Sequence, residues 1–258
     1  MRVPRAVRRL SDPLLERTPV PVLSGPNRGR WWSLASAGHG YATGRRAAAQ
    51  TELLSTLIHP GDVVWDVGAH HGYVALCAAS RVGPTGQVHA FEPSQKNRTM
   101  LERHLRWNRA SNVHVHPFAL SVYDGEACFG GQGTSKTFAL GAGEEVVRVC
   151  TAASLLARGL CPEPTFVKID VEGAEADVVA GLIATLPPHA RLLIAMHDRA
   201  VDEQCSAQLA GAGVELIASS ALTRCREGDW VGDPDLFCMG PAHAGLQRDR
   251  DLLLAAGF

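Results

Sequence analysis

One segment constrains the fold of this chain more than any other: residues 63–73 combine an apolar run, a glycine-bounded turn and the start of a helical pattern. The run at 63–67 is rich in β-branched and aromatic side chains, and Asp66 is its only polar residue, as in a strand buried on both faces. Gly68 and Gly72 bound the turn. A strand, a tight turn and a helix in this order predict a parallel sheet that holds its ligand at the first loop.

From about residue 51 onward, short apolar runs typical of strands alternate with segments whose apolar residues have helical spacing. The expected strands are 63–67, 87–91, 113–118, 165–169, 191–196, 214–217 and 236–239. The expected helices are 52–58, 73–80, 96–107, 174–182 and 202–210. Strand alternating with helix predicts a doubly wound α/β domain with a mostly parallel sheet. Residues 121–150 break the alternation, and we expect there an insertion of two short strands, 126–129 and 146–149, around the glycine-rich loop 130–143.

Composition excludes several other classes of protein. The 258 residues are 46% hydrophobic, and 25 basic side chains stand against 26 acidic ones, so neither disorder nor broad nucleic-acid binding is expected. The longest apolar runs are far shorter than the roughly 18 residues that mark a membrane helix. Prolines interrupt every N-terminal stretch that could serve as a signal peptide, which predicts a cytoplasmic protein. Seven widely spaced cysteines without a C-x-x-C pair predict free thiols.

The start of the chain differs from the rest. Residues 1–30 hold seven of the basic side chains and only two acidic ones, and they show no sustained period. We expect residues 1–45 to form a basic N-terminal arm and lead-in, and residues 46–258 to form the ligand-binding domain, with 121–150 as its insertion.

An acidic residue, Glu92, stands twenty positions after Gly72, at the end of the second expected strand. In a doubly wound fold this strand lies beside the first, so the acid can accept hydrogen bonds from the ribose of a ligand on the loop. The loop does not fit G-x-G-x-x-G, because His70 stands midway between the glycines; an NAD-linked oxidoreductase is therefore a weaker alternative. S-adenosylmethionine has no phosphate, so a loop that binds it does not need several glycines to bring the backbone close to a pyrophosphate. His70 tolerates a positive φ better than most side chains, which would let it occupy the turn.

Four motifs in this order resemble one known family. They are Gly-Asp-Val-Val-Trp-Asp-Val-Gly-Ala at 61–69, Phe-Glu-Pro at 91–93, Ala-Leu-Ser at 119–121 and Val-Lys-Ile-Asp-Val-Glu-Gly-Ala-Glu at 167–175. Together they are similar to the FkbM family of S-adenosylmethionine-dependent methyltransferases over about residues 22–200, and 24–29 and 39–41 resemble its lead-in. The resemblance implies a class I methyltransferase fold with an antiparallel last strand in a seven-stranded sheet. It also implies a lead-in that packs on the domain after about Pro21, and methyl transfer usually to a hydroxyl.

The resemblance and the loop together imply which residues hold the cofactor. The expected contacts are Asp66, Gly68, Ala69, His70, Gly72, Tyr73, Glu92, Pro93, Ala119 and Asp170. The expected partner is a small-molecule acceptor, a natural product or a sugar, and the sequence leaves the oligomeric state open. Two departures from the family pattern are His70 and the pair Arg46-Ala47, where relatives often carry Tyr-Glu. They keep a non-catalytic or regulatory member of the same fold as the alternative.

Methyl transfer to a hydroxyl requires that the acceptor oxygen be aligned with the methyl carbon, and a base that removes the hydroxyl proton. Ligands bind at the C-terminal ends of strands in this architecture, where Asp170 and Glu172 follow the fourth strand and His197 follows the fifth. Asp170 is the first candidate for the general base or for the group that holds the acceptor, with Glu172 and His197 as rivals. A helix cap is the alternative role for Asp170, and Glu175 reads as a solvated helix residue.

A divalent metal is possible at these strand ends but not expected. Asp170, His197 and Asp198 could supply its ligands, but they lack the tight spacing of a metal motif.

Two features outside the motifs lie near the expected site. Trp31 and Trp32 are more simply explained by packing in a core or lid than by stacking on a ligand. The loop 131–137, which contains Ser135 and Lys136, is either a mobile acceptor lid or a surface excursion without a role.

Overall fold

A seven-stranded sheet forms the centre of the protein, in a computed structural model that describes residues 13–34, 36, 39–45, 48–130, 139–140, 143–197, 199–219, 235–239 and 251. The strand order is β12-β13-β11-β10-β3-β4-β5, with the bounds β3 (Val63–Val67), β4 (Gln87–Phe91), β5 (Val113–His116), β10 (Phe166–Ile169), β11 (Arg191–Ala195), β12 (Glu215–Ser219) and β13 (Asp235–Met239). Neighbours from β11 to β5 are parallel, whereas β13 is antiparallel to both β11 and β12. The predicted doubly wound sheet with an antiparallel last strand is confirmed.

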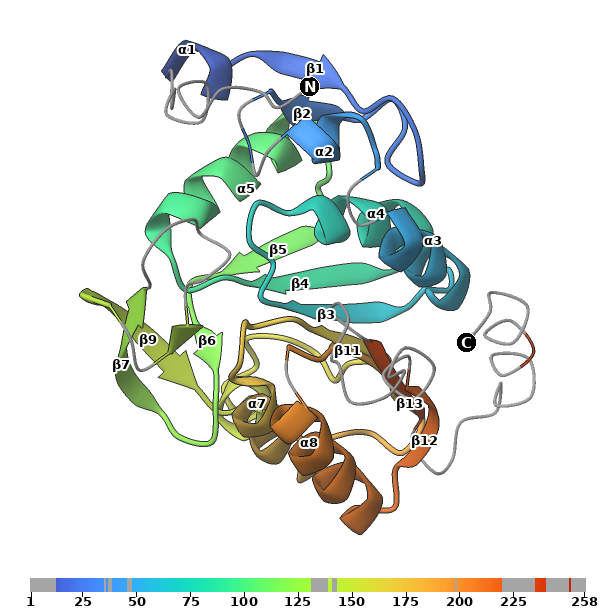
Figure 1. Cartoon of the computed structure of the whole chain (residues 1–258), viewed down its shortest axis with the longest axis vertical. Helices are drawn as coiled ribbons and strands as arrows, with labels where there is room; N and C mark the ends of the chain where they lie inside the picture. Colours follow the sequence, from blue (N-terminus) through green and yellow to red (C-terminus); the bar gives the residue numbers. More distant parts are fainter. Residues whose placement is uncertain are drawn as a thin grey trace.

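Helices cover both faces of this sheet (Figure 1). One face packs against α3 (Ala48–Leu57), α4 (Tyr73–Val82) and α5 (Gln95–Asn108), and the other against α6 (Ala152–Ala157), α7 (Glu175–Ile183) and α8 (Arg199–Gly211). Successive side chains of a strand point to opposite faces, so Val64 enters the first apolar core while Trp65 and Val67 enter the second. The strand β3, whose sequence does not alternate between apolar and polar residues, is therefore buried on both faces, as predicted.

Some helix boundaries differ from the expected ones. α3 begins at Ala48 and α8 at Arg199, several residues before their predicted starts. α6 was not predicted, although the Thr151 side chain accepts the N–H of Ser154 as an N-cap does. Of the helices described, none is long and apolar enough to cross a membrane.

The chain after β5 leaves the main sheet and builds a second, four-stranded one. Its order is β6-β9-β7-β8, with the bounds β6 (Ala119–Leu120), β7 (Gly125–Gly130), β8 (Ala139–Leu140) and β9 (Glu145–Cys150). Antiparallel pairing of β7 with β9 confirms the two short strands predicted in the insertion. The strand predicted at 113–118 is confirmed as β5 but ends two residues early, at His116, because Pro117 has no N–H to donate and the chain then changes to the second sheet. The candidate lid at 131–137 lies outside the described residues.

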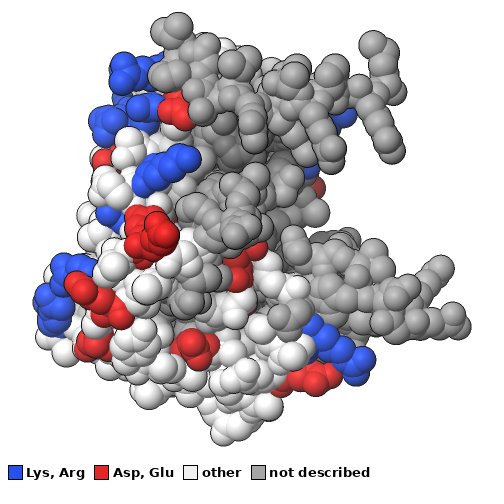
Figure 2. Space-filling view, turned by 60° about the vertical axis from the view of Figure 1, so that its left-hand side comes forward, with Lys and Arg blue, Asp and Glu red and all other residues white. Residues whose placement is uncertain are grey.

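The lead-in packs on the face that carries α4 and α5. It contains α1 (Pro13–Glu16), β1 (Pro19–Pro21), β2 (Trp31–Ser33) and α2 (His39–Ala42), and β1 pairs with β2. Asn27 is buried and donates from Nδ2 to the carbonyl of Tyr73 at 2.7 Å, and the N–H of Ser33 donates to Nε2 of His104 at 3.0 Å. On the face in Figure 2, several basic side chains lie at the upper end of the molecule, which holds the lead-in and α5 in Figure 1, and other basic side chains lie lower down beside acidic ones.

Trp32→Ala tests whether the lead-in contributes to the core, since this side chain is 1% exposed. We expect the free energy of unfolding to fall by about 3–5 kcal/mol, the usual cost of truncating a buried aromatic side chain. Chemical denaturation followed by circular dichroism measures the change. The matched control is Trp31→Ala, because the neighbouring side chain is 46% exposed and such surface changes cost roughly 0.5 kcal/mol. Equal effects of the two substitutions would contradict a core role for the lead-in.

Candidate active site

The turn between β3 and α4 depends on residues in the left-handed region. Gly68, His70 and Gly72 have φ values of 80°, 50° and 86°. A Cβ on Gly68 would lie 1.9 Å from the carbonyl oxygen of Asp170, so no other residue fits there without moving the backbone. The positive φ predicted for His70 is confirmed. The loop therefore lies directly against the end of β10.

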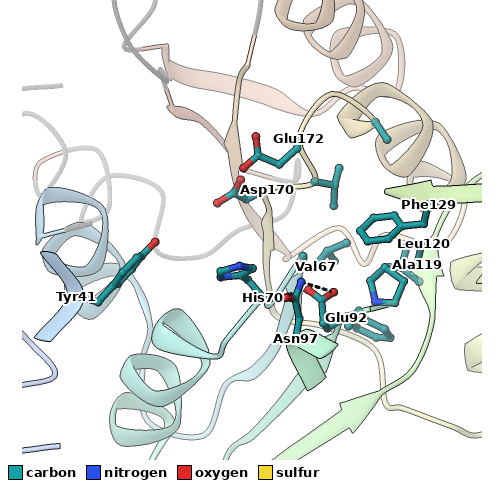
Figure 3. Close-up of a pocket in the computed structure, with 15 residues that line it drawn as sticks. Tyr41, Val67, His70, Glu92, Asn97, Ala119, Leu120, Phe129, Asp170 and Glu172 are labelled. Carbon is teal, nitrogen blue, oxygen red and sulfur yellow. Dashed lines mark hydrogen bonds between the residues drawn. The ribbon is translucent and has the colours of Figure 1, made fainter. Parts of the chain in front are cut away.

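Glu92, at the end of β4, lies beside this loop. Its Oε2 accepts the N–H of His70 at 2.8 Å, and its Oε1 accepts the N–H of Ser94 at 3.0 Å and Nδ2 of Asn97 at 3.1 Å. Burial raises the pKa of the Glu92 carboxyl, and these three donors oppose the rise. The hydrogen bond to His70 joins the acid to the loop, and the bond from Asn97 is drawn in Figure 3.

Two adjoining hollows open where the strands end. The larger, about 790 Å³ including space open to solvent, is lined by Tyr41, Val67, Gly68, His70, Phe91, Glu92, Pro93, Asn97, Ala119, Leu120, Phe129, Asp170, Val171, Glu172 and Ala174 (Figure 3). The smaller, about 390 Å³, is lined by Trp32, Tyr41, Gln50, Gly68, Ala69, His70, His71, Tyr73, Val74, Lys168 and Asp170. Loop, strand ends and lead-in meet here, at the edge where doubly wound sheets bind their ligands.

Lys168 connects the loop with Asp170. Its Nζ lies 3.2 Å from Oδ1 of Asp66 and 3.4 Å from Oδ2 of Asp170, and it donates to the carbonyl of Gly68 at 3.3 Å. Burial opposes the charge on this nitrogen, but the carboxylates of Asp66 and Asp170 outweigh burial and raise the pKa of Lys168. The side chain therefore remains an ammonium that ties the end of β3 to the end of β10.

His197 follows β11 and lies among three carboxylates. Its Nδ1 is 2.8 Å from Oε1 of Glu175, and its Nε2 is 3.5 Å from Oδ1 of Asp170 and 3.4 Å from Oε2 of Glu172. Burial lowers the pKa of the ring, but the bond and charge of Glu175, followed by the charges of Asp170 and Glu172, raise it to about 9. At neutral pH the ring is therefore an imidazolium.

The prediction that Glu175 is a solvated helix residue is wrong. Its side chain is fully buried and accepts the N–H groups of Val171 and Gly173 as well as binding His197. Glu175, rather than Asp170, thus holds the turn that leads into α7. An acid in the first turn of a helix is common on a surface, and nothing in the local sequence marks this one as buried.

The structure brings most of the predicted site residues to the two hollows. Those that line one or both are Gly68, Ala69, His70, Tyr73, Glu92, Pro93, Ala119, Asp170 and Glu172. Asp66 is fully buried, the backbone of Gly72 packs against Leu101, and His197 reaches the larger hollow through Asp170 and Glu172. The lining residues that were not among the predicted contacts include Tyr41, Asn97, Phe129 and Lys168. Lys168 stands inside the motif at 167–175, and Tyr41 stands inside the stretch 39–41 that resembles the family's lead-in.

Asp170, Glu172 and His197 also form a group in which one potential ligand atom from each lies within 4.8 Å of the others. Carboxylate oxygens and an imidazole nitrogen suit several divalent ions. A metal would have to displace the proton that the carboxylates stabilise on His197. Asp198, the third ligand of the alternative drawn from the sequence, lies outside the described residues.

The raised pKa of His197 predicts a dependence of stability on pH. The pKa of the ring is 6.5 for an unperturbed histidine and about 9 in the folded protein. The charged ring therefore stabilises the fold fully below about pH 6.5, and this contribution is lost as pH rises through about 9. We expect the Tm of His197→Gln to fall less between pH 6.5 and 9.5 than the Tm of the wild type. His189→Gln is the control because its side chain is exposed; a wild-type profile in both variants would refute the assignment.

Comparisons with known proteins agree with these features. The FkbM methyltransferase domain family matches residues 66–220, a range that holds the loop, Glu92, Asp170 and His197. The hexuronic acid methyltransferase AglP of Haloferax volcanii is 28% identical over 142 residues, which cover 53% of this chain. The match covers 56% of AglP, so the chain spans about half the length of this relative.

Two solved structures are similar to parts of this chain. The methyltransferase FkbM of Methylobacillus flagellatus is 20% identical with a TM-score of 0.49, over 69% of this chain and 43% of that one. Fibrillarin of Aeropyrum pernix, in complex with S-adenosyl-L-methionine, is 17% identical with a TM-score of 0.48, over 74% and 73%. At these TM-scores the likeness adds nothing to the strand order. The family match, however, spans more than half of the chain, and the chain therefore belongs to the FkbM family of S-adenosylmethionine-dependent methyltransferases.

Proposed function

We propose that this methyltransferase methylates a hydroxyl of a small molecule, a natural product or a sugar. The observation that carries the proposal is the meeting of the Gly68 loop, Glu92 and Asp170 around one hollow. A relative that is named for methylation of a hexuronic acid supports a sugar as the acceptor.

The residues around the larger hollow have the chemistry that S-adenosylmethionine requires. Phe91, Leu120 and Phe129 offer apolar surface for a purine, and Glu92 offers carboxylate oxygens for the ribose hydroxyls. The partly exposed Asp170 contributes negative charge, which favours a sulfonium. The described residues that line this hollow include neither Lys nor Arg. These properties support the same assignment of the cofactor contacts that the motifs imply.

In the proposed mechanism Asp170 acts as the base. When bound, S-adenosylmethionine supplies a methyl group that is activated for displacement by the positive sulfur. Asp170 holds the acceptor hydroxyl and would take its proton as the oxygen receives the methyl group, while the methyl–sulfur bond breaks and leaves its electron pair on a neutral sulfur. Alignment of this kind contributes on the order of 7–11 kcal/mol, and a positioned base contributes roughly 10²–10⁴-fold. Lys168, 3.4 Å from Oδ2, keeps the carboxylate of Asp170 in place.

Glu172 and His197 suit a supporting role better than the role of base. His197 is protonated at neutral pH, so it donates protons rather than accepting them. Oε2 of Glu172 lies 3.4 Å from Nε2 of His197, and the backbone of Glu172 has a positive φ of 57°. We assign both residues to the orientation of Asp170.

The proposal also divides the chain into functional parts. Residues 46–258, with the insertion 121–150, form the methyltransferase domain, and residues 1–45 form the lead-in that packs on it. Trp32 and Tyr41 line the smaller hollow, which supports a lead-in that takes part in the site. The pair Arg46-Ala47, a departure from the family pattern, lies outside the described residues.

Glu92→Gln tests the cofactor site. We expect calorimetry to show that the wild type binds S-adenosylmethionine and S-adenosylhomocysteine, and that the variant binds both about 10- to 100-fold more weakly. Hydrogen bonds to a charged group are worth roughly 1.5–3 kcal/mol, which corresponds to this loss. Glu102→Gln is the control, because this side chain on α5 is 50% exposed. Undiminished binding by a folded Glu92→Gln protein would contradict the ribose assignment, and no binding by the wild type would contradict the function.

Asp170→Asn tests the base. We expect single-turnover transfer of a radiolabelled methyl group to a panel of glycosides and uronic acids to slow by about 10²–10⁴-fold. Binding of S-adenosylhomocysteine should persist. Asp177→Asn on α7 is the control, because its side chain is exposed. A full rate in Asp170→Asn would move the role to Glu172, and the lack of any transfer by the wild type would favour the non-catalytic alternative.

A further inference from the structure

Four residues line both hollows: Tyr41, Gly68, His70 and Asp170. Residues shared by two adjoining hollows mark the place where the hollows join. Gly68, His70 and Asp170 come from the loop after β3 and the end of β10, whereas Tyr41 comes from α2 of the lead-in. Figure 3 shows Tyr41 across the hollow from Asp170 and Glu172, with its hydroxyl turned toward their side of the site.

Aromatic packing fixes the ring of Tyr41. Its centroid lies 5.8 Å from that of Trp32 at an interplanar angle of 31°, and 4.9 Å from that of Tyr73 at 63°. Trp32 in turn stacks on His104 of α5 at 3.7 Å. Tyr73 is the first residue of α4, directly after the cofactor loop. The ring is therefore wedged between the lead-in and the helix that follows the loop, and its hydroxyl is the part that faces the junction.

The two hollows differ in the part of the cofactor that they suit. This step rests on the proposed function, in which Glu92 serves the ribose; Glu92 lines the larger hollow but is not among the described residues that line the smaller one. With adenosine in the larger hollow, the methionine tail belongs to the smaller one. The sulfonium joins adenosine to the tail, so it belongs where the hollows join. A cation at this junction has the carboxylate of Asp170 on one side and the phenol of Tyr41 on the other.

We infer that Tyr41 is a further cofactor-binding residue, whose hydroxyl oxygen contacts the sulfonium end of the cofactor opposite Asp170. An oxygen held in place by ring packing stabilises the positive sulfur without first having to be ordered when the cofactor binds. The product S-adenosylhomocysteine has a neutral sulfur and gains little from this contact. Tyr41 thus favours the bound donor over the spent product, and the difference is measurable without knowledge of the acceptor.

Tyr41→Phe removes only the oxygen and keeps the ring that packs on Trp32 and Tyr73. We expect calorimetry to show about 2- to 10-fold weaker binding of S-adenosylmethionine, the range of a single lost hydrogen bond or comparable polar contact. Binding of S-adenosylhomocysteine should stay at the wild-type value. An analogue that carries an ammonium group in place of the sulfonium should follow S-adenosylmethionine. Tyr123→Phe is the matched control, because this tyrosine between β6 and β7 is 46% exposed and lines neither hollow.

A loss of equal size for all three ligands would overturn the inference, because Tyr41 would then be only a wall of the site. Unchanged binding of all three would overturn it as well. Failure of the wild type to bind S-adenosylhomocysteine is a different outcome, since it contradicts the proposed function and removes the basis of the inference with it. Thermal denaturation verifies that each variant is folded. Tyr41→Leu provides a second test: it should weaken all three ligands and, in addition, lose the preference for the charged ones.

Discussion

The site depends on one buried ammonium. Lys168 joins Asp66 at the end of β3, the carbonyl of Gly68 in the loop, and Asp170 at the end of β10. Such a buried charge is tolerated only when its partners compensate it closely, and removal of one partner leaves the others uncompensated. The loop that would bind the cofactor and the carboxylate proposed as base are therefore parts of one electrostatic unit. Displacement of either would expose Lys168 to an incomplete set of partners.

A second cation repeats this arrangement one strand further along the sheet. His197 is held by the buried Glu175 and lies close to Asp170 and Glu172. Asp170 and Glu172, which border the larger hollow, thus each lie within 3.5 Å of a positive side chain that is not among its described lining residues. Fixed charges of this kind need no rearrangement when a cationic ligand arrives, which is the main electrostatic advantage of a folded site over water. The net negative rim of the hollow is consistent with a sulfonium cofactor.

The sequence predicted those parts of the site that follow from the geometry of a parallel sheet. Glu92 and Asp170 each end a strand, and parallel strands bring such residues to one edge whatever the surrounding packing. Glu175 was misjudged because its burial depends on His197, 22 positions further along the chain. Tyr41 was missed for a similar reason, since its approach to the site is set by the packing of the lead-in on α4 and α5. Spacing in the sequence predicts positions along strands, but not which side chain from another segment will cover them.

The lead-in also has a consequence for the order in which the molecule can form. Its hydrogen bonds join Asn27 to Tyr73 and Ser33 to His104, across 46 and 71 positions of the chain. This segment cannot make these two bonds until α4 and α5 exist, and contacts between such remote residues also carry a cost in loop-closure entropy that slows their formation. The wall that carries Tyr41 is therefore made early in synthesis but positioned late. Completion of this side of the candidate site therefore waits until the strands and helices that follow the lead-in in the sequence have formed.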